Sequence, residues 1–208
     1  MTTPLPQLQP TVFTPPTKPG SKMVSLIQDR SYGIIALRLV PSSSPSPSPS
    51  PSASSEQAKP TTQNTQVLLI KQRTIYSSLP SYWTFPKGHP EYHDSSVKHT
   101  AIRELHEETN LTISLDDILT FRAQPEEAAV SFSEVYENPI RKVGKEVRYW
   151  AALVPGEQKV KIQEKEIEEA RWCNWEEAKE LITFGEGKKI LRDVGVCLDE
   201  GPLALSNL

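Results

Sequence analysis

Residues 103–108 of the chain read Arg-Glu-Leu-His-Glu-Glu, and this stretch is the strongest indicator of the fold. Apolar residues recur before and within it at the spacing of one helix face: Val97, Ala101 and Leu105. With about 100° of rotation per helical residue, Glu107 lies about 60° behind Glu104, and Glu108 about 40° ahead of it. The apolar stripe begins within the same arc. We therefore expect the three glutamates at the rim of the buried face of a helix.

Clustered carboxylates of this kind have two interpretations. Like charges three and four residues apart on a helix repel by a few tenths of a kcal/mol when exposed, and by more in a cleft. A short acidic run is most often a solvated helix face. A hard cation reverses the repulsion, because carboxylate oxygens are the ligands that Mg²⁺ and Mn²⁺ take. The neighbouring sequence has to decide between a solvated face and a metal site.

The preceding segment, residues 83–89, reads WTFPKGH and predicts an extended stretch that ends in a glycine loop. Together with the glutamates it resembles the Nudix box, written G-x5-E-x7-R-E-U-x-E-E-x-G-U with U aliphatic. Gly88 matches the opening glycine, residues 103–109 match the R-E-U-x-E-E-x core, and Leu111 matches the closing aliphatic residue. This combination favours the metal site over the solvated face.

The chain departs from the box in three places. Fourteen residues separate Gly88 from Arg103, where the pattern has thirteen. The first glutamate of the box is therefore Asp94 when counted from Gly88, and Ser95 when counted back from Arg103. Asp94 can still reach Arg103 if the extra residue bulges out, and Asp94 or Ser95 is also a natural N-cap for a helix that begins near residue 96. Asn110 replaces the closing glycine, a mild change because asparagine tolerates the left-handed conformation.

The resemblance implies a Mg²⁺- or Mn²⁺-dependent hydrolysis of a phosphoanhydride bond in a compound linked to a nucleoside diphosphate. In the family's pattern the metal ligands are three glutamates and one backbone carbonyl: Glu104, Glu107, Glu108 and Gly88. Arg103 is structural and pairs with Asp94 or a box glutamate. The implied catalytic residues are Glu104, Glu108 and Glu166. Glu104 doubles as the general base unless a later loop supplies it, in which case Glu166 is the first candidate and Glu164 the second.

Three stretches are similar to the diadenosine tetraphosphate hydrolase branch of that family: residues 83–89 (WTFPKGH), 145–150 (KEVRYW) and 169–178 (EARWCNWEEA). That branch cleaves its substrate asymmetrically to ATP and AMP. A diphosphoinositol polyphosphate or capped-RNA phosphohydrolase is the alternative enzyme. The alternative from a different functional class is a nucleotide-binding sensor that is catalytically weak.

Basic and aromatic side chains near the box are the expected substrate contacts: Tyr82, Lys87, His89, Lys145, Arg148 and Tyr149. Arg141 and Lys142 extend the basic group, which attracts a polyphosphate or else is merely solvated. Trp83 and Trp150 are further candidates for stacking on a base. Because side chains alternate along a strand, Tyr149 and Trp150 face opposite sides, so at most one of them faces the cleft.

Composition bounds the class of protein. The chain has 208 residues and a net charge of −3 with mixed signs, which argues against general nucleic-acid binding and against a membrane surface. Its two cysteines lie far apart and indicate a reducing compartment. The N-terminus lacks an apolar run of signal or transmembrane length. We expect a cytoplasmic or nuclear monomer that acts on a small-molecule nucleotide.

The expected organisation is a disordered Pro-rich tail (1–28), a Nudix hydrolase domain (29–200) with a Pro/Ser-rich loop insert (41–65), and a C-terminal tail (201–208). Strands are predicted at 31–40, 66–73, 118–123, 146–154, 160–162 and 170–173. A capping box at Asn174 opens a helix to residue 182, and a last helix covers 186–198. The first two strands form a hairpin across the insert, since loop closure costs little extra with length. This order predicts an α/β class, and the resemblance implies an α/β/α sandwich with a mixed sheet.

Overall fold

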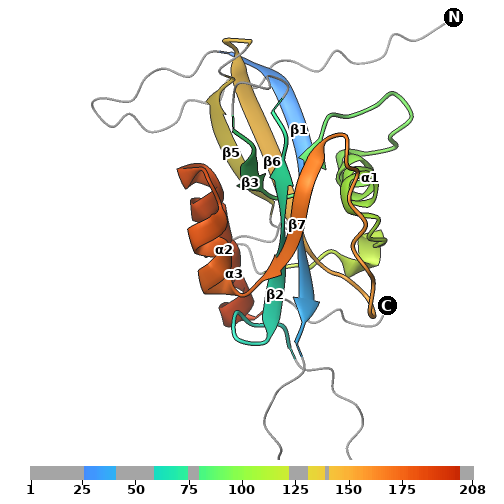
Figure 1. Cartoon of the computed structure of the whole chain (residues 1–208), viewed down its shortest axis with the longest axis vertical. Helices are drawn as coiled ribbons and strands as arrows, with labels where there is room; N and C mark the ends of the chain where they lie inside the picture. Colours follow the sequence, from blue (N-terminus) through green and yellow to red (C-terminus); the bar gives the residue numbers. More distant parts are fainter. Residues whose placement is uncertain (1–25, 41–58, 75–79, 122–130, 139–140, 202–208) are drawn as a thin grey trace, which may run out of the picture.

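The computed structural model describes residues 26–40, 59–74, 80–121, 131–138 and 141–201. Within them, seven strands form one mixed sheet and three α-helices pack on it (Figure 1). The strands are β1 (Ile27–Leu39), β2 (Thr65–Gln72), β3 (Tyr82–Thr84), β4 (Lys87–Gly88), β5 (Phe132–Glu137), β6 (Gly144–Leu153) and β7 (Ile167–Cys173). The helices are α1 (Val97–Thr109), α2 (Trp175–Leu181) and α3 (Gly185–Glu200). The predicted α/β class with a mixed sheet is confirmed.

Strand β1 is the centre of the sheet. It pairs in parallel with β6 over almost its whole length, and antiparallel with β2 at Leu37↔Val67. The predicted hairpin of the first two strands is therefore confirmed, and residues 41–58 of the predicted insert lie outside the described residues. Near its middle β1 also pairs with β4 at Tyr32↔Gly88. This pairing holds the glycine loop of the box against the central strand.

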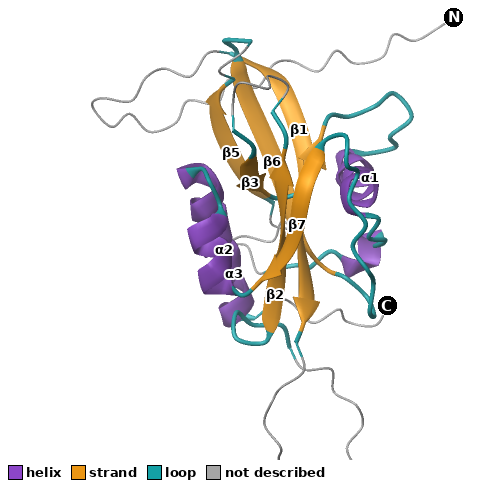
Figure 2. Ribbon diagram, in the orientation of Figure 1, coloured by secondary structure: helices purple, strands orange, loops and turns teal. Residues whose placement is uncertain are grey.

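Helices cover both faces of the sheet, as the ribbon views show (Figures 1 and 2). Inward residues of β1 alternate between the two cores: Ile35 and Leu37 pack on the α2–α3 side, and Ile34 and Ala36 on the α1 side. A strand buried on both faces carries a continuous apolar run, which is why GIIAL at 33–37 shows no polar alternation. The three-layer sandwich predicted from the sequence is confirmed.

Both ends of α1 are capped by its own sequence. The Ser96 side chain accepts a hydrogen bond from the His99 N–H at 3.3 Å, so the N-cap is Ser96, and the predicted N-cap at Asp94 or Ser95 is wrong. Asp94 is not available because its carboxylate binds Arg103. At the other end Asn110 adopts the left-handed conformation with φ 60°, as predicted.

Helices α2 and α3 follow the prediction closely. Asn174 and Glu177 form the reciprocal capping box, with the Asn174 side chain bound to the Glu177 N–H at 2.9 Å and the Glu177 side chain to the Asn174 N–H at 2.9 Å. The inward residues of α3 are apolar: Ile190, Leu191, Val194 and Leu198. No helix in the described part of the chain is long and apolar enough to cross a membrane.

Other element predictions need correction. The strand predicted at 118–123 is a single bridge, Ile118↔Ala152, and residues 122–130 lie outside the described part. The strand predicted at 160–162 is absent from the described residues, because the Lys161 N–H instead binds the Thr109 carbonyl at the end of α1. Strand β1 begins at Ile27, earlier than predicted and inside the predicted tail, whose residues 1–25 lie outside the described part. Strand β5 was not predicted.

Gly33 is where β1 and the box approach most closely. A Cβ at this position would lie 2.3 Å from the Pro86 carbonyl oxygen and 2.9 Å from the Tyr149 ring. Because the first of these neighbours is backbone, it cannot move away cheaply. We expect Gly33→Ala to lower the free energy of unfolding by about 2 kcal/mol or more, measured by denaturant titration.

The matched control for that change is Gly185→Ala, at the first residue of α3. A Cβ there meets no atom within 4 Å. An alanine at such a site reduces the freedom of the unfolded chain, so we expect an unfolding free energy equal to the parent's or about 0.5 kcal/mol higher. Equal stability of the two variants would contradict the close approach at Gly33.

Candidate active site

Three segments that are distant in the sequence meet around the glutamates of α1: strand β4, helix α1 and the turn before β7. Gly88 of β4 lies directly against the carboxylate of Glu104. A Cβ built on Gly88 would fall 2.1 Å from the Glu104 carboxyl carbon and from its Oε2. Only a glycine leaves room for that carboxylate beside the backbone. The opening glycine and the first core glutamate of the box are thus in direct contact.

Glu108 is the most buried of the box glutamates, with 2% of its surface exposed. Its Oε2 accepts a hydrogen bond from the Lys87 backbone N–H at 2.9 Å, which fixes the carboxylate beneath β4. Burial raises the pKa of Glu108 to about 8; the Lys87 charge and hydrogen bond oppose that rise, and the charges of Glu104 and Glu166 add to it. A carboxyl in this setting is ready to exchange its proton for a cation.

Arg103 organises the loop between β4 and α1. Its Nε and Nη2 each donate to the Asp94 carboxylate at 3.0 Å, and Nη2 also donates to the His89 carbonyl at 2.9 Å. The Arg103 guanidinium holds the pKa of Asp94 far below its ordinary value, and Asp94 in turn raises the pKa of Arg103. Asp94, and not Ser95, therefore occupies the place of the first box glutamate, and the extra loop residue does not prevent the contact.

The same guanidinium reaches the box glutamates. Arg103 Nη1 donates to Glu104 Oε1 at 3.0 Å and to Glu107 Oε2 at 2.9 Å. Burial raises the pKa of Glu104, the Arg103 charge and hydrogen bond lower it, and Glu107 and Glu166 raise it further. The arginine thus offsets part of the repulsion among the carboxylates.

The donor set fits a divalent cation in its chemistry. As folded here, no three acidic, histidine or cysteine side chains of the described residues are grouped closely enough to hold a metal ion. Arg103 engages two of the three carboxylates, so Glu104 and Glu107 would have to exchange that contact for the cation. All the groups concerned are oxygen donors, and Glu104 adjoins the Gly88 backbone, which are the ligands of Mg²⁺ or Mn²⁺.

The turn that carries Glu166 is attached to the C-terminal end of α1. The Gln163 N–H binds the Glu108 carbonyl at 3.2 Å and the Lys161 N–H binds the Thr109 carbonyl at 2.9 Å, so these two helix-end carbonyls gain partners from the turn. Glu166 is exposed on this turn, yet its charge acts on both Glu104 and Glu108. The sequence predicted Glu166 in a loop after the box, and in the fold this loop lies near enough for Glu166 to interact electrostatically with Glu104 and Glu108.

The predicted substrate contacts do not form one cluster. Lys87 and Tyr82 lie together: the Lys87 Nζ is 5.8 Å from the centre of the Tyr82 ring, and both side chains bind Gln72 Oε1. Lys145 and Arg148 do not lie together. By strand alternation Lys145 faces the α2–α3 side, where it contacts Asp29, and Arg148 faces the α1 side, where it contacts Glu146.

Tyr149 differs most from its predicted role. The ring is buried with 1% exposure and packs edge-on against Phe85, and its hydroxyl donates to Glu134 Oε1 at 3.1 Å. Trp150 faces the opposite core, as strand alternation predicts, and it too is buried. The expectation that Tyr149 or Trp150 offers an open ring for stacking is therefore wrong, because both faces of β6 are covered.

Two acidic residues near the box were missed in the sequence. Glu134 of β5 points inward, and burial raises its pKa while the Tyr149 hydroxyl and Lys87 lower it. The alternation Phe132, Glu134, Tyr136 marks the inward face of β5, but the apolar Val135 faces out and hides it. Asp29 of β1 is buried and binds His89 Nε2 at 2.8 Å. Asp29 is the first residue of the predicted domain, and no sequence motif surrounds it that could have marked it as part of the site.

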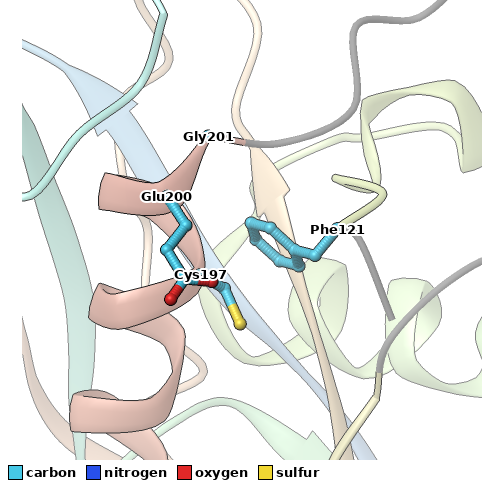
Figure 3. A pocket seen from close by; sticks show the side chains of 4 residues that line it. All are labelled: Phe121, Cys197, Glu200 and Gly201. Carbon is cyan, nitrogen blue, oxygen red and sulfur yellow. The ribbon is translucent and has the colours of Figure 1, made fainter. Parts of the chain in front are cut away.

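Two hollows are open to solvent in the described part. One, of about 230 Å³, lies at the end of α3 and is lined by Phe121, Cys197, Glu200 and Gly201 (Figure 3). Its lining has no basic group for a phosphate. The other, of about 440 Å³, adjoins the box and is lined by Gln28, Asp29, Arg30, Tyr32, His89, Pro90 and Arg141.

Comparison with known families agrees with this geometry. The model of the NUDIX domain matches residues 60–194, which is well over half of the chain. The chain belongs to the Nudix family. The matched range begins at residue 60, within the last part of the predicted insert, and contains every box residue, the Glu166 turn and α2.

Individual relatives extend the comparison. Nudix hydrolase 2 of Arabidopsis thaliana is 31% identical over 118 residues, which are 55% of this chain and 36% of that protein. The chain thus spans about a third of the length of this curated relative. This relative is by name a Nudix hydrolase.

Two solved structures share the fold. A C. elegans Ap4A hydrolase in a binary complex has a TM-score of 0.56 at 21% identity, and the alignment covers 81% of this chain and 96% of that one. The NUDIX domain of Shewanella oneidensis NrtR complexed with ADP ribose has a TM-score of 0.54 at 14% identity, covering 80% of this chain and 86% of that one. At these identities the likeness establishes the Nudix fold.

Proposed function

We propose that this chain hydrolyses diadenosine tetraphosphate to ATP and AMP with Mg²⁺, or Mn²⁺ in its place. The observation that carries the proposal is the contact of Gly88 with Glu104 beside the buried Glu108. This contact brings several hard oxygen donors together, although the carboxylates among them repel each other in the absence of a cation. The chain would act as a monomer on this small-molecule substrate.

The choice of substrate rests on the residues around the box. The WTFPKGH segment supplies Lys87, which lies between the Tyr82 ring and the box, where it can meet phosphate oxygens. The Nudix fold is shared with a C. elegans Ap4A hydrolase. The Tyr82 and Phe184 rings, whose centres are 5.2 Å apart, offer partly exposed aromatic surface for a base near Lys87.

The proposed reaction adds water to a phosphorus atom and breaks the bond from that phosphorus to a bridging oxygen. When bound, a divalent cation would neutralise charge on the phosphate oxygens and lower the pKa of the attacking water. Glu104, Glu107 and Glu108 would hold it together with the Gly88 carbonyl. Lys87 neutralises charge on the phosphate chain, and Arg103 keeps the loop in place through Asp94. Positioning and charge neutralisation dominate such reactions.

A carboxylate must accept the proton of the attacking water. Glu104 is engaged by Arg103 and assigned to the metal, whereas the exposed Glu166 side chain forms no ion pair within the described residues. We expect Glu166→Gln to lower kcat by about 10²-fold, the usual contribution of a general base, in a steady-state assay. Glu164→Gln, on the same turn, is the control and should stay within about 3-fold of the parent. If both variants match the parent, Glu104 is the base.

The experiment that tests the substrate is Mg²⁺-dependent hydrolysis of diadenosine tetraphosphate with the products separated by chromatography. ATP and AMP in equal amounts, absent with EDTA, support the proposal. Binding without turnover contradicts it and favours the nucleotide sensor. Turnover of an inositol pyrophosphate or capped RNA in preference to the dinucleotide assigns the alternative enzyme.

A further inference from the structure

Strand β1 contains a bulge next to the box. Its register with β6 passes from Ile27↔Gly144 directly to Asp29↔Lys145, so Gln28 has no partner on β6. A bulge re-aims the neighbouring side chains and recurs beside active sites. Here it sets Asp29 opposite Lys145, and the Asp29 side chain is 1% exposed.

Asp29 holds three groups at once. Its Oδ1 accepts from His89 Nε2 at 2.8 Å, and its Oδ2 accepts from Asn138 Nδ2 at 2.9 Å and from Lys145 Nζ at 3.3 Å. Burial alone would raise the pKa of Asp29, but the hydrogen bonds from His89 and Asn138 and the Lys145 charge keep it below its ordinary value. The carboxylate is therefore charged. Both of its oxygens accept hydrogen bonds, and its negative charge is not exposed to solvent.

Asn138 extends this network to a second basic residue. Its Oδ1 accepts from the Arg141 N–H at 3.1 Å, so the residue that binds Asp29 also fixes the Arg141 backbone. The Arg141 side chain makes no ion pair within the described residues. Within the described residues Arg30, the next residue after Asp29, has one ion pair, through Nε to Glu146 at 3.3 Å, and both of its terminal nitrogens remain available for another partner.

Asp29, Arg30 and Arg141 line the 440 Å³ hollow described above, which has the volume of a ligand site. The hollow begins at His89, the residue after the Gly88 metal ligand, and the His89 ring is 55% exposed. Two arginines face it, and its one acid is neutralised by Lys145. Guanidinium groups with unused donors are the usual partners of phosphate.

We propose that this hollow binds the part of the substrate's phosphate chain that lies beyond the metal-binding glutamates, with Arg30 and Arg141 as its contacts and Asp29 as the residue that positions the pocket. This deepens the proposed function and rests on it for the identity of the substrate. It assigns the chain to substrates with an extended polyphosphate, because only a phosphate chain that continues past the box would bring further phosphates to Arg30 and Arg141.

The test uses the full chain and inorganic tripolyphosphate in EDTA, so that neither a divalent ion nor turnover is needed. Calorimetry should give a Kd at least about 10-fold weaker for Arg30→Gln/Arg141→Gln than for the parent. Arg192→Gln removes an exposed arginine of α3 that is far from the hollow in sequence and absent from its lining, and it should leave the Kd unchanged. Equal affinity of the double variant and the parent overturns the proposal.

Kinetics separate this proposal from the substrate assignment. With diadenosine tetraphosphate the double variant should raise KM by about 10-fold and change kcat far less, since the arginines bind substrate and transition state alike. If the parent fails to hydrolyse diadenosine tetraphosphate while tripolyphosphate binding still depends on the arginines, the substrate is wrong and the pocket stands. If the parent hydrolyses it and the double variant behaves like the parent, the pocket alone is refuted.

Discussion

Glu108→Gln should lower kcat for the phosphoanhydride substrate by about 10²-fold or more, because it removes a ligand of the proposed cation. The side chain is buried against the Lys87 N–H, so a glutamine of the same shape can keep that hydrogen bond through its carbonyl oxygen. The fold should therefore remain while the chemistry is lost. Steady-state rates with saturating Mg²⁺ measure the effect.

The same variant should change how stability depends on pH. The pKa of Glu108 is about 8 in the folded chain and 4.5 at its ordinary value. Between these values the folded chain keeps the proton and the unfolded chain has lost it. The contribution of Glu108 to folding stability is therefore fully present below pH 4.5 and is lost as pH rises toward 8, by about 1 kcal/mol per pH unit.

Denaturant titrations in EDTA at several pH values test this slope. The slope should be shallower in Glu108→Gln by about 1 kcal/mol per unit, and Glu104 and Glu134, whose pKa values are raised in the same direction, should contribute to the slope that remains. Mg²⁺ should stabilise the parent more at pH 8 than at pH 6, since a cation binds the ionised carboxylates. Identical slopes in the two proteins would mean that Glu108 is not held protonated.

Gly88→Ala is the second change with a large expected effect. The new Cβ would overlap the Glu104 carboxylate, at 2.1 Å from its carbon, and would push it off the backbone. A displacement of about 1 Å at a catalytic group costs about 10²-fold in rate, so we expect a loss of that size. Because only the flexible end of Glu104 has to move, the free energy of unfolding should change by less than about 1 kcal/mol.

Gly33→Ala is the matched comparison for this change, because there the clash is with backbone and the expected loss is in stability. For Gly88→Ala, thermal unfolding with and without Mg²⁺ provides the second measurement. The Mg²⁺-dependent rise in Tm should shrink relative to the parent, because Glu104 has left its place. Full activity in Gly88→Ala would show that the contact between Gly88 and Glu104 is not needed.

The sequence was most informative where the determinants are local. The spacing of Ala101 and Leu105, the left-handed Asn110 and the reciprocal box at Asn174 all depend on residues within a few positions, and all are found in the structure. The contact of Asp94 with Arg103 could also be expected, but the choice between Asp94 and Ser95 needed the loop geometry.

The sequence failed where the outcome depends on distant partners. Alternation assigns Tyr149 and Trp150 to opposite faces of β6 but does not show that helices cover both faces. It likewise gives no sign that Lys145 meets Asp29, which lies 116 positions away. Strand β5 was missed because its inward side chains are Glu134 and Tyr136, while its apolar Val135 faces solvent.

The attachment of the Glu166 turn to the end of α1 has a consequence for how the family's loops can vary. Two backbone hydrogen bonds, from Lys161 and Gln163, tie the candidate base to the helix that carries the glutamates proposed to bind the cation. The distance between base and metal site is then set by this junction and not by the chain between them. Changes of length in the connections on either side of β5 and β6 can thus be absorbed while the reacting groups keep their spacing, which makes these connections the natural place to graft new substrate preferences.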